Sequence, residues 1–324
     1  MAILTYREAV AHGIAQEMRR DPGLVFLGED IAGAGGVFKT NAGLLEEFGP
    51  DRVRDTPISE QAILGAAMGA AMTGVPVIAE IMFSDFLAVC FDIVANQIAK
   101  TRYMTAGQVN LPLVIQTLNG GGTRFGAQHS QSLENWIMMV PGLKVAAPSS
   151  PADVVGLMAA AVRDPDPVVF FEHKALLATK GEVPDGEWVD ELGTARVRRV
   201  GSDVSIVALA AMVPKALEAA EQLAGEGISA EVIDLRSLVP LDTQTLLASV
   251  AKTGRLVTVE ENPRLCGWGA EISSIVADEA FWDLEGPIVR VTTPHIPLPA
   301  AASLEDVAVP STGHVVEAVR RLVD

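Results

Sequence analysis

Glu60 is the residue whose type and position most clearly suggest chemistry. It stands directly before a run of small and apolar residues, and Gly65 and Gly69 follow it in an E-x4-G-x3-G pattern. The first turn of a helix favours a carboxylate, because the helix dipole places partial positive charge there. Spacing alone leaves two interpretations open: a functional carboxylate, or an ordinary acidic residue of a first helical turn with a tightly packed helix behind it.

His129 is the second candidate. It follows the glycine-rich segment Asn119–Gly126. An imidazole titrates near neutral pH, so it can bind an anion or transfer a proton, although a single loop histidine is commonly an exposed side chain without a function. The glycines Gly120–Gly122 either let the backbone approach a ligand closely or form a plain loop.

The common catalytic and nucleotide-binding motifs are absent. The sequence contains no G-x-x-x-x-G-K-[ST], no H-E-x-x-H and no G-x-S-x-G, and its five histidines have no metal-ligand spacing. Gly33-Ala-Gly35-Gly36 lacks the flanking strand and the spacing of a dinucleotide-binding fingerprint, so we interpret it as a flexible loop.

Composition and charge exclude several classes of protein. The chain has 324 residues, 49% hydrophobic and 20% charged, which is typical of a folded protein of two domains. Its formal net charge of −17 disfavours binding to nucleic acids and to anionic membranes. Cys90 and Cys266 cannot form a disulfide framework, and the first residues show no basic segment followed by an apolar run. We therefore expect a cytoplasmic protein without a signal peptide.

Short apolar strands alternate with helices along both halves of the chain. In the first half, strands are expected near 24–27, 52–54, 77–81, 113–117, 144–147 and 168–171. In the second half, they are expected near 204–209, 230–235, 256–259 and 288–291. A buried helix is expected after Ser59, and a long helix from about Asp85 to Tyr103. This alternation is typical of parallel sheets covered by helices on both faces.

We therefore predict an α/β fold with two doubly wound domains. The apolar periodicity stops around the turn residues Gly181–Gly186. This places one domain at residues 1–180, a linker at 181–193 and a second domain at 194–324. In such domains, ligands bind beyond the carboxyl ends of the strands.

The motifs in these elements resemble those of one known family. The E-x4-G-x3-G pattern at Glu60 resembles the cofactor motif in the pyrimidine-binding domain of thiamine-diphosphate enzymes. Other stretches agree in order and spacing over essentially the whole chain: LGEDI, GPDRVRDTPISE, AEIMFSDF, AKTRYM, AQHSQS, PGLKVAAPSSPADVVGLMAAAVRDPDPVVF and VIDLRSLVPLD. Together they resemble the β subunit of the E1 component of 2-oxo acid dehydrogenases, of the pyruvate, branched-chain 2-oxo acid or acetoin type.

The resemblance implies a transketolase-like pyrimidine-binding domain followed by a transketolase C-terminal domain. It implies thiamine-dependent oxidative decarboxylation of a 2-oxo acid, or cleavage of acetoin, with acyl transfer to a lipoyl-bearing E2 acyltransferase. It also implies an α2β2 heterotetramer in which the α subunit holds the cofactor's diphosphate and Mg²⁺ through a GDG motif. This sequence contains no GDG, so we expect a β subunit that is an active oxidoreductase only together with its α subunit.

Two other functions stay open at this point. One is a split subunit of a transketolase-like or deoxyxylulose-phosphate-synthase-like enzyme, although such enzymes normally carry the diphosphate domain on the same chain. The other is a scaffold that docks E2 without catalysis, and the presence of both Glu60 and His129 argues against it. The sequence does not determine the substrate, because much of that pocket belongs to the α subunit.

The resemblance implies roles for individual residues. Glu60 matches the carboxylate that bonds to N1′ of the cofactor and favours its imino tautomer. Neighbouring cofactor contacts are matched by Ile58, Met82, which departs from the polar residue of some relatives, and Phe86, which would stack on the aminopyrimidine. His129 matches the histidine that contacts the substrate or transfers a proton during acyl transfer to lipoamide.

Two further groups of residues match the family. Glu29 and Asp92 match acidic positions in a polar passage between the two active sites of relatives. A potassium ion is implied at a set of main-chain carbonyls and carboxylates: Leu113, Ala161, Val162, Asp164 and Asp166. The pair Pro165-Asp166 differs from an asparagine-containing version of that site, and the segment is also strong turn chemistry.

Overall fold

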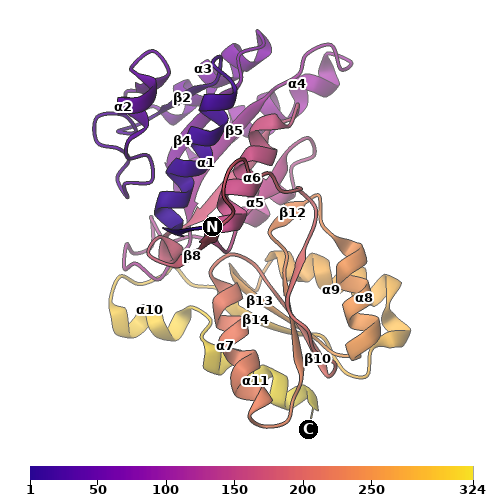
Figure 1. Ribbon diagram of the computed structural model, residues 1–324. Helices are drawn as coiled ribbons and strands as arrows, with labels where there is room; N and C mark the ends of the chain where they lie inside the picture. Colours follow the sequence, from indigo (N-terminus) through magenta and orange to yellow (C-terminus); the bar gives the residue numbers. More distant parts are fainter. Residues whose placement is uncertain (324) are drawn as a thin grey trace. The chain divides into compact units, whose positions relative to one another are not determined.

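The computed structural model describes residues 1–323, which form two compact units (Figure 1). Unit 1 consists of Met1–Asn119 and Trp136–Leu192, and unit 2 consists of Gly120–Asn135 together with the chain from Gly193 onward. The segment Gly120–Asn135, which lies inside the first domain of the expected division, therefore clusters with unit 2. Within residues 1–323, no helix is both long enough and apolar enough to cross a membrane.

Parallel strands form the sheet of unit 1, in the order β6-β7-β5-β4-β2-β3. Their bounds are β2 (Val25–Gly28), β3 (Val53–Asp55), β4 (Val77–Phe83), β5 (Leu113–Asn119), β6 (Lys144–Ala146) and β7 (Val168–His173). Every residue of β5 and β7 is buried. The structure confirms the predicted α/β fold. The apolar sequence of these strands is continuous because both of their faces are buried.

Helix α1 (Tyr6–Arg20) begins with a capping box. The Thr5 hydroxyl accepts a hydrogen bond from the Glu8 N–H at 3.2 Å, and the Glu8 carboxylate accepts one from the Thr5 N–H at 2.8 Å. This capping box satisfies main-chain groups that the helix itself leaves unpaired. The helix packs against α6 (Pro151–Arg163) (Figure 1). Gly13 permits the close approach, since an added Cβ would lie 3.2 Å from the Cα of Val155.

Two parts of unit 1 differ from the expectation. The segment expected as a linker contains β8 (Lys180–Val183), which pairs antiparallel with β1 (Ala2–Thr5). The helix expected from Asp85 to Tyr103 is interrupted after the 3₁₀ helix η1 (Ser84–Ala88) and resumes as the π-helical η2 (Ile93–Ile98), which continues into α4 (Ala99–Met104). Periodicity misses both features, because β1 and β8 are short and partly exposed and because a change of helix type leaves the residue pattern unchanged.

The remaining helices of the first half of the chain are α2 (Leu44–Phe48), α3 (Glu60–Met72), α5 (Glu134–Met138) and the 3₁₀ helix η3 (Lys174–Leu176).

Unit 2 has a second sheet, in the order β14-β13-β10-β11-β9. All neighbours are parallel except β9, which is antiparallel to β11. The strands of this unit are β9 (Arg196–Arg199), β10 (Val204–Ala208), β11 (Ala230–Asp234), β12 (Ser237–Val239), β13 (Leu256–Pro263) and β14 (Val289–Thr293). Four of them lie where the sequence predicts, while β9 and β12 carry too little apolar pattern to be recognised.

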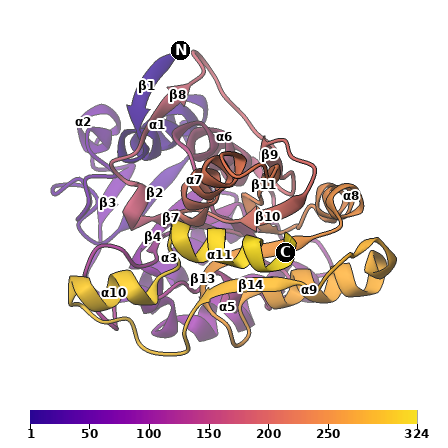
Figure 2. The same cartoon turned by 90° about the horizontal axis from the view of Figure 1, so that it is seen from below.

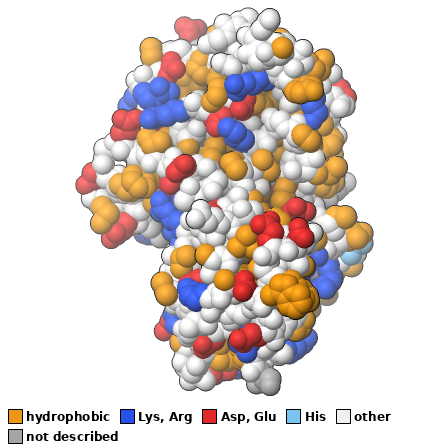
Figure 3. Space-filling view, turned by 90° about the vertical axis from the view of Figure 1, so that its right-hand side faces the viewer, with side chains coloured by type: hydrophobic (Ala, Val, Ile, Leu, Met, Phe, Trp, Pro, Cys, Tyr) orange, Lys and Arg blue, Asp and Glu red, His pale blue; other side chains and the backbone are white. Residues whose placement is uncertain are grey.

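Four helices contact this sheet: α7 (Met212–Ala224), α8 (Thr243–Thr253), α9 (Trp268–Glu279) and α11 (Thr312–Val323). Unit 2 also contains the 3₁₀ helix η4 (Phe281–Asp283) and α10 (Ala302–Ala308). Helices α7 and α11 lie side by side (Figure 2). On the face of the molecule in Figure 3, Lys and Arg side chains are scattered among acidic and apolar ones.

A buried ion pair joins the two packed helices of unit 1. Glu17 on α1 is fully buried, and its carboxylate accepts hydrogen bonds from Arg163 Nη2 at 2.7 Å and Nε at 2.9 Å. Arg20 Nε donates to the same carboxylate at 2.7 Å. Removing the carboxylate leaves Arg20 without its acceptor and leaves Arg163 paired only with the exposed Glu187, and breaking a buried pair from one side is costly.

We predict that Glu17→Ala lowers the free energy of unfolding by about 2–4 kcal/mol, because a buried charge pair is broken from one side. The matched control is Glu47→Ala, which removes an exposed pair with Arg19 and should cost less than about 1 kcal/mol. Urea denaturation of both variants measures the difference. Equal losses would contradict the structural role of Glu17.

Candidate active site

The carboxyl ends of three neighbouring strands place the candidate cofactor residues at one edge of the sheet in unit 1. Strand β2 lies between β3 and β4, and all three run parallel. Glu29 follows β2, Glu60 follows β3 after a short turn, and Met82 lies at the end of β4. The chain leads from β2 to its neighbour β3 on one side, and from β4 to its neighbour β5 on the other side. The connections therefore diverge between β2 and β4. This edge is therefore a topological switch point, where open α/β sheets bind their ligands.

Glu60 is the first residue of α3, and Ser59 is its N-cap. The side chain of Glu60 is half-buried. Within the part of the chain that the structure describes, its carboxylate makes no hydrogen bond or ion pair. The unpaired N–H groups of the helix end favour negative charge at this position. The carboxylate is therefore available as a hydrogen-bond acceptor for a ligand.

The charge of Glu60 raises the pKa of two neighbouring side chains. Partial burial, the charge of Asp30 and the charge of Glu60 raise the pKa of Glu29. Burial and the charge of Glu60 raise the pKa of the Cys90 thiol to about 12, so this cysteine stays protonated and unreactive at neutral pH. Its Sγ also lies 3.6 Å from the main-chain oxygen of Phe86. The structure thus brings Glu60, Glu29 and η1 together.

The three apolar residues of the expected cofactor site differ in exposure. Phe86 is half-buried in η1, and its ring meets the ring of Phe83 edge to face at 5.4 Å between centroids. Met82 is half-buried on β4, four residues before Phe86, so both lie at the same strand end. Ile58 is 78% exposed in the turn before α3. This chain alone therefore leaves Ile58 largely uncovered.

Helix α3 is less buried than the sequence predicts. Ile63, Leu64 and Ala67 are buried, but the opposite face of the helix is exposed. Gly65 packs on η2, since an added Cβ would lie 3.5 Å from Ile93 Cδ1, whereas an added Cβ at Gly69 would meet nothing within 4 Å. The expectation of a wholly buried helix is wrong for this chain. Small uncharged residues suit an interface between chains as well as a core.

His129 and Asp92 differ in unit and in exposure. His129 is half-buried in the segment Gly120–Asn135 of unit 2, and its N–H donates to the Gly126 carbonyl at 3.3 Å. Asp92 is exposed at the start of η2 and accepts a hydrogen bond from Asn96 Nδ2 at 2.7 Å. The structure thus assigns Glu60 and His129 to different units, which the sequence did not indicate.

The expected potassium residues gather at the end of α6 and the start of β5. They are Leu113, Ala161, Val162, Asp164 and Asp166. Lys144 Nζ lies 2.8 and 2.6 Å from the two carboxylate oxygens of Asp164 and 3.7 Å from Asp166 Oδ2. Arg102 Nη1 lies 2.5 Å from Asp166 Oδ1. Both carboxylates therefore already have a cationic side chain as partner.

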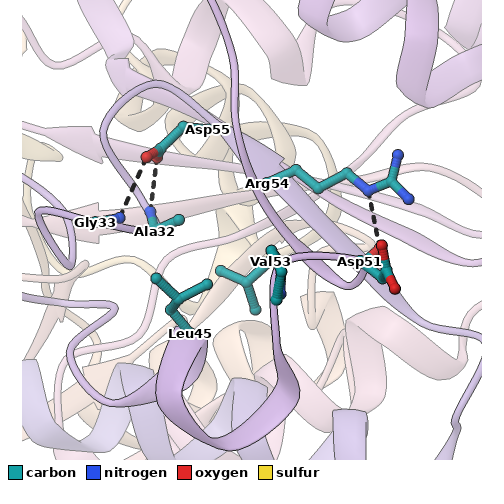
Figure 4. Close-up of a pocket in the computed structure, with 8 residues that line it drawn as sticks. Ala32, Gly33, Leu45, Asp51, Val53, Arg54 and Asp55 are labelled. Carbon is teal, nitrogen blue, oxygen red and sulfur yellow. Dashed lines mark hydrogen bonds between the residues drawn. The ribbon is translucent and has the colours of Figure 1, made fainter.

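A separate surface pocket of about 540 Å³ lies in unit 1 beside β3 (Figure 4). Asp55 fills part of this region, because its carboxylate accepts hydrogen bonds from the N–H groups of Ala32 at 2.7 Å and Gly33 at 3.2 Å. Arg54 Nε donates to the main-chain oxygen of Asp51 at 2.8 Å. The loop that contains Gly33-Ala-Gly35-Gly36 thus binds a carboxylate of its own chain. None of the expected site residues lines the pocket.

Comparison with known proteins identifies the two domains and the relatives of this chain. Residues 3–180 match the transketolase pyrimidine-binding domain, and residues 193–315 match the transketolase C-terminal domain. The β subunit of acetoin:2,6-dichlorophenolindophenol oxidoreductase from Cupriavidus necator is 48% identical over 98% of this chain and 97% of that protein. The pyruvate dehydrogenase E1 component subunit beta from Rickettsia felis is 45% identical over 98% of each chain.

This chain belongs to the family of E1 β subunits of pyruvate and acetoin dehydrogenases. The resemblance seen in the motifs is thereby confirmed. The fold of this chain is also similar to that of a split-gene transketolase, whose structure is described as an inactive β4 tetramer. The TM-score is 0.82 at 28% identity, and the match covers 99% of this chain and 98% of that one.

Two buried carboxylates of this E1 β chain were not predicted. Glu80 on β4 is 3% exposed and accepts hydrogen bonds from Asn41 Nδ2 at 2.8 Å and from Gln116 Nε2 at 3.4 Å. Glu172 on β7 is fully buried, and within residues 1–323 neither of its carboxylate oxygens has a hydrogen-bond partner. Each is a charged residue inside an otherwise apolar strand, and this is the signal that could have identified them.

These carboxylates form a coupled series with Glu29. Burial raises the pKa of Glu80 to about 7; the hydrogen bond from Asn41 opposes this shift, and the charge of Glu29 adds to it. Burial and the charge of Glu80 raise the pKa of Glu172 well above its ordinary value. Each ionised carboxylate disfavours ionisation of the next one. The interior behind the site therefore holds protons at and below neutral pH.

We predict that Glu80→Gln changes how the stability of the chain depends on pH. The folded chain binds a proton at Glu80 up to about pH 7, while the unfolded chain releases it near the ordinary glutamate pKa of roughly 4.3. Folding stability should therefore fall as pH rises through this window, by roughly 3 kcal/mol in total. Glutamine cannot ionise and still accepts from Asn41, so the variant should lose this decline and be more stable than the parent at pH 8.

Melting temperatures between pH 5 and pH 8 measure this effect. Glu46→Gln, the same substitution on the surface of α2, controls for the loss of a carboxylate as such. A Glu80→Gln variant whose melting temperature follows that of the parent at every pH would contradict the assignment.

Proposed function

We propose that this chain is the β subunit of a thiamine-diphosphate-dependent E1 component. With an α subunit in an α2β2 heterotetramer, it would act on a 2-oxo acid or on acetoin and pass the acyl group to a lipoyl-bearing E2. The observation that carries the proposal is the half-buried Glu60 carboxylate, available as an acceptor at the start of α3 and at the switch point of the sheet. The family membership of the chain supports the same conclusion.

The residues at this edge fit the pyrimidine half of thiamine diphosphate. An aminopyrimidine needs a carboxylate acceptor opposite its ring nitrogen and apolar groups against its faces. Glu60 offers the first, and Phe86, Met82 and Ile58 offer the second. The chain has no GDG motif for the diphosphate and Mg²⁺, so we assign these to the α subunit.

When bound, thiamine diphosphate supplies the nucleophilic C2 atom that attacks the substrate carbonyl. Glu60 contributes by accepting a hydrogen bond from the pyrimidine N1′, which favours the imino tautomer of the ring. This hydrogen bond is stronger in a site without water, because the local dielectric constant is low. Phe86 and Met82 fix the plane of the ring. His129 binds the substrate carboxylate or moves a proton during acyl transfer, and Glu29 and Asp92 belong to the proposed acidic passage.

Exposed apolar side chains support the need for a partner chain. Large apolar residues of unit 1 stand open to solvent: Ile58, Met72, Val89, Tyr103 and Met104. They lie on the elements that follow β3 and β4, together with the exposed face of α3. Such exposure of large apolar groups is typical of a surface that another chain covers.

The proposal includes a potassium ion at the end of α6. Because Asp164 and Asp166 are paired with Lys144 and Arg102, the ion would rest mainly on the main-chain carbonyls of Leu113, Ala161 and Val162. The transketolase alternative is not favoured, since the relatives named as E1 β or acetoin dehydrogenase β are 45–48% identical, against 28% for the split transketolase.

We predict that the isolated chain binds thiamine diphosphate weakly and has no decarboxylase activity, because the groups for the diphosphate lie elsewhere. Addition of the α subunit should restore both. Calorimetry with thiamine diphosphate and Mg²⁺ measures binding, and assays with pyruvate, branched-chain 2-oxo acids and acetoin identify the substrate. Tight Mg²⁺-dependent binding by the isolated chain would overturn the assignment.

We predict that Glu60→Gln folds and assembles normally but slows exchange of the cofactor's C2 proton. Glutamine keeps the size of the side chain but not its charge, so the imino tautomer loses its support. The loss should be on the order of 10²-fold or more, as for other positioned proton-transfer groups. Deuterium exchange at C2, followed by NMR in the α–β complex, measures it. Exchange at the parent's rate would remove Glu60 from the proposed role.

We predict that His129→Ala keeps the affinity for the cofactor but loses overall activity with the lipoyl acceptor. If His129 serves acyl transfer, decarboxylation with an artificial electron acceptor should survive. If it binds the substrate, that assay should fail as well, through a raised KM. Normal rates in both assays would show that His129 is a bystander.

A further inference from the structure

The segment that carries His129 is bound to unit 2 by two buried carboxylates. The Gly121 N–H donates to Glu261, and the Ser132 hydroxyl donates to Glu261 Oε1 at 3.2 Å. The Gly122 N–H donates to Glu305 Oε1 at 2.8 Å, and the Arg124 N–H donates to Glu305 Oε2 at 3.2 Å. Main-chain groups that the sequence left open for a ligand are thus occupied by the chain's own carboxylates.

The backbone of the segment is shaped for this contact. Gly120, Gly122, Arg124 and Gly126 all have left-handed φ angles, of +85°, +85°, +66° and +74°. Such alternation turns successive N–H groups toward one side and makes a concave site for an anion. Gly121 lies so close that an added Cβ would stand 3.0 Å from Leu298 Cδ1 and 3.2 Å from Glu305 Oε1.

The two carboxylates are buried and have strong hydrogen-bond partners. Glu305 is fully buried and Glu261 is 8% exposed, and burying such groups is costly unless they are paired. Arg124 of the loop pairs with Glu305. Burial lowers the pKa of Lys215, and the nearby charges of Glu261 and Glu305 oppose this shift. The cost of burying these charges is therefore offset by contacts that also hold the loop.

The far end of the segment is bound by β13. Asn262 follows Glu261 and donates through Nδ2 to the Ser132 carbonyl at 2.8 Å. Asn135 in turn donates to the Cys266 carbonyl at 2.8 Å. His129 therefore stands between two anchored stretches, Gly121–Arg124 and Ser132–Asn135, and its position follows from theirs.

We propose that Glu305 and Glu261 are positioning residues for His129. They hold the loop by accepting its main-chain N–H groups, and they affect the reaction only through the placement of the imidazole. This inference rests on the proposed function, from which it takes the role of His129.

The experiment combines hydrogen exchange with a double-mutant cycle in the assembled α–β complex. Glu305→Ala should speed amide exchange in residues 120–135 and lower kcat with the lipoyl acceptor by roughly 10–100-fold, since small misplacements of a catalytic group have effects of this size. Glu305→Gln should recover much of the rate, because its amide oxygen still accepts from Gly122. Cofactor affinity should not change in either variant.

Asp306→Ala is the matched control. Asp306 also pairs with Arg124, but its side chain is 64% exposed, so its removal should leave loop exchange and kcat unchanged. Glu261→Ala provides a second test at the other carboxylate and should speed exchange at Gly121, because the acceptor of its N–H is removed. Unchanged amide exchange in Glu305→Ala would overturn the proposal, because it would show that Glu305 does not hold the loop.

The cycle with His129→Ala decides whether Glu305 acts through the imidazole. In the His129→Ala background, Glu305→Ala should cause no further loss of kcat. A second loss of the same size would overturn the proposal and show a separate structural role. If His129→Ala alone is fully active, the proposed function of His129 fails, and with it the positioning role, while the exchange data still show whether the carboxylates hold the loop.

Discussion

The parallel register of β2, β3 and β4 is the constraint on which the candidate active site depends. Gly28 at the end of β2 is in register with Asp55 on one side and with Glu80 on the other. The loops that follow these strands must therefore emerge at one edge. Strand alternation also decides which side chains face inward, and a slip by one residue would turn Glu80 to the opposite face of the sheet. The site is thus a consequence of backbone pairing before any side chain takes part.

Local patterns predicted much of this arrangement. The capping box at Thr5 and Glu8 and the acidic start of α3 at Glu60 depend on residues close in sequence. The buried strands follow from continuous apolar runs. The distant partners of the segment Gly120–Asn135 could not be predicted in this way, because Glu261 and Glu305 lie well over 100 residues along the chain. The exposed face of α3 could not be predicted for another reason, since alanine and glycine suit a core and an interface equally.

Four of the buried carboxylates differ in the partners that they have. Glu17 and Glu260 are each matched by arginines, Arg163 and Arg290, that neutralise them within hydrogen-bond distance. Glu80 accepts hydrogen bonds from the amide groups of Asn41 and Gln116. Burial raises the pKa of Glu80 and of Glu172, and it also raises the pKa of Glu260 in spite of its arginine. The first group stabilises the packing of helices and strands. The second group lies on β4 and β7, and acids whose pKa is strongly perturbed cluster at functional sites.

The chain passes between its two units three times, after Asn119, after Asn135 and after Leu192. Domains joined by a single linker can be exchanged between genes by one recombination event. Here such an exchange would separate Gly121 and Gly122 from the carboxylates that accept their hydrogen bonds. A recombinant that keeps these hydrogen bonds must therefore keep residues 120–135 together with the part of unit 2 that begins at Gly193.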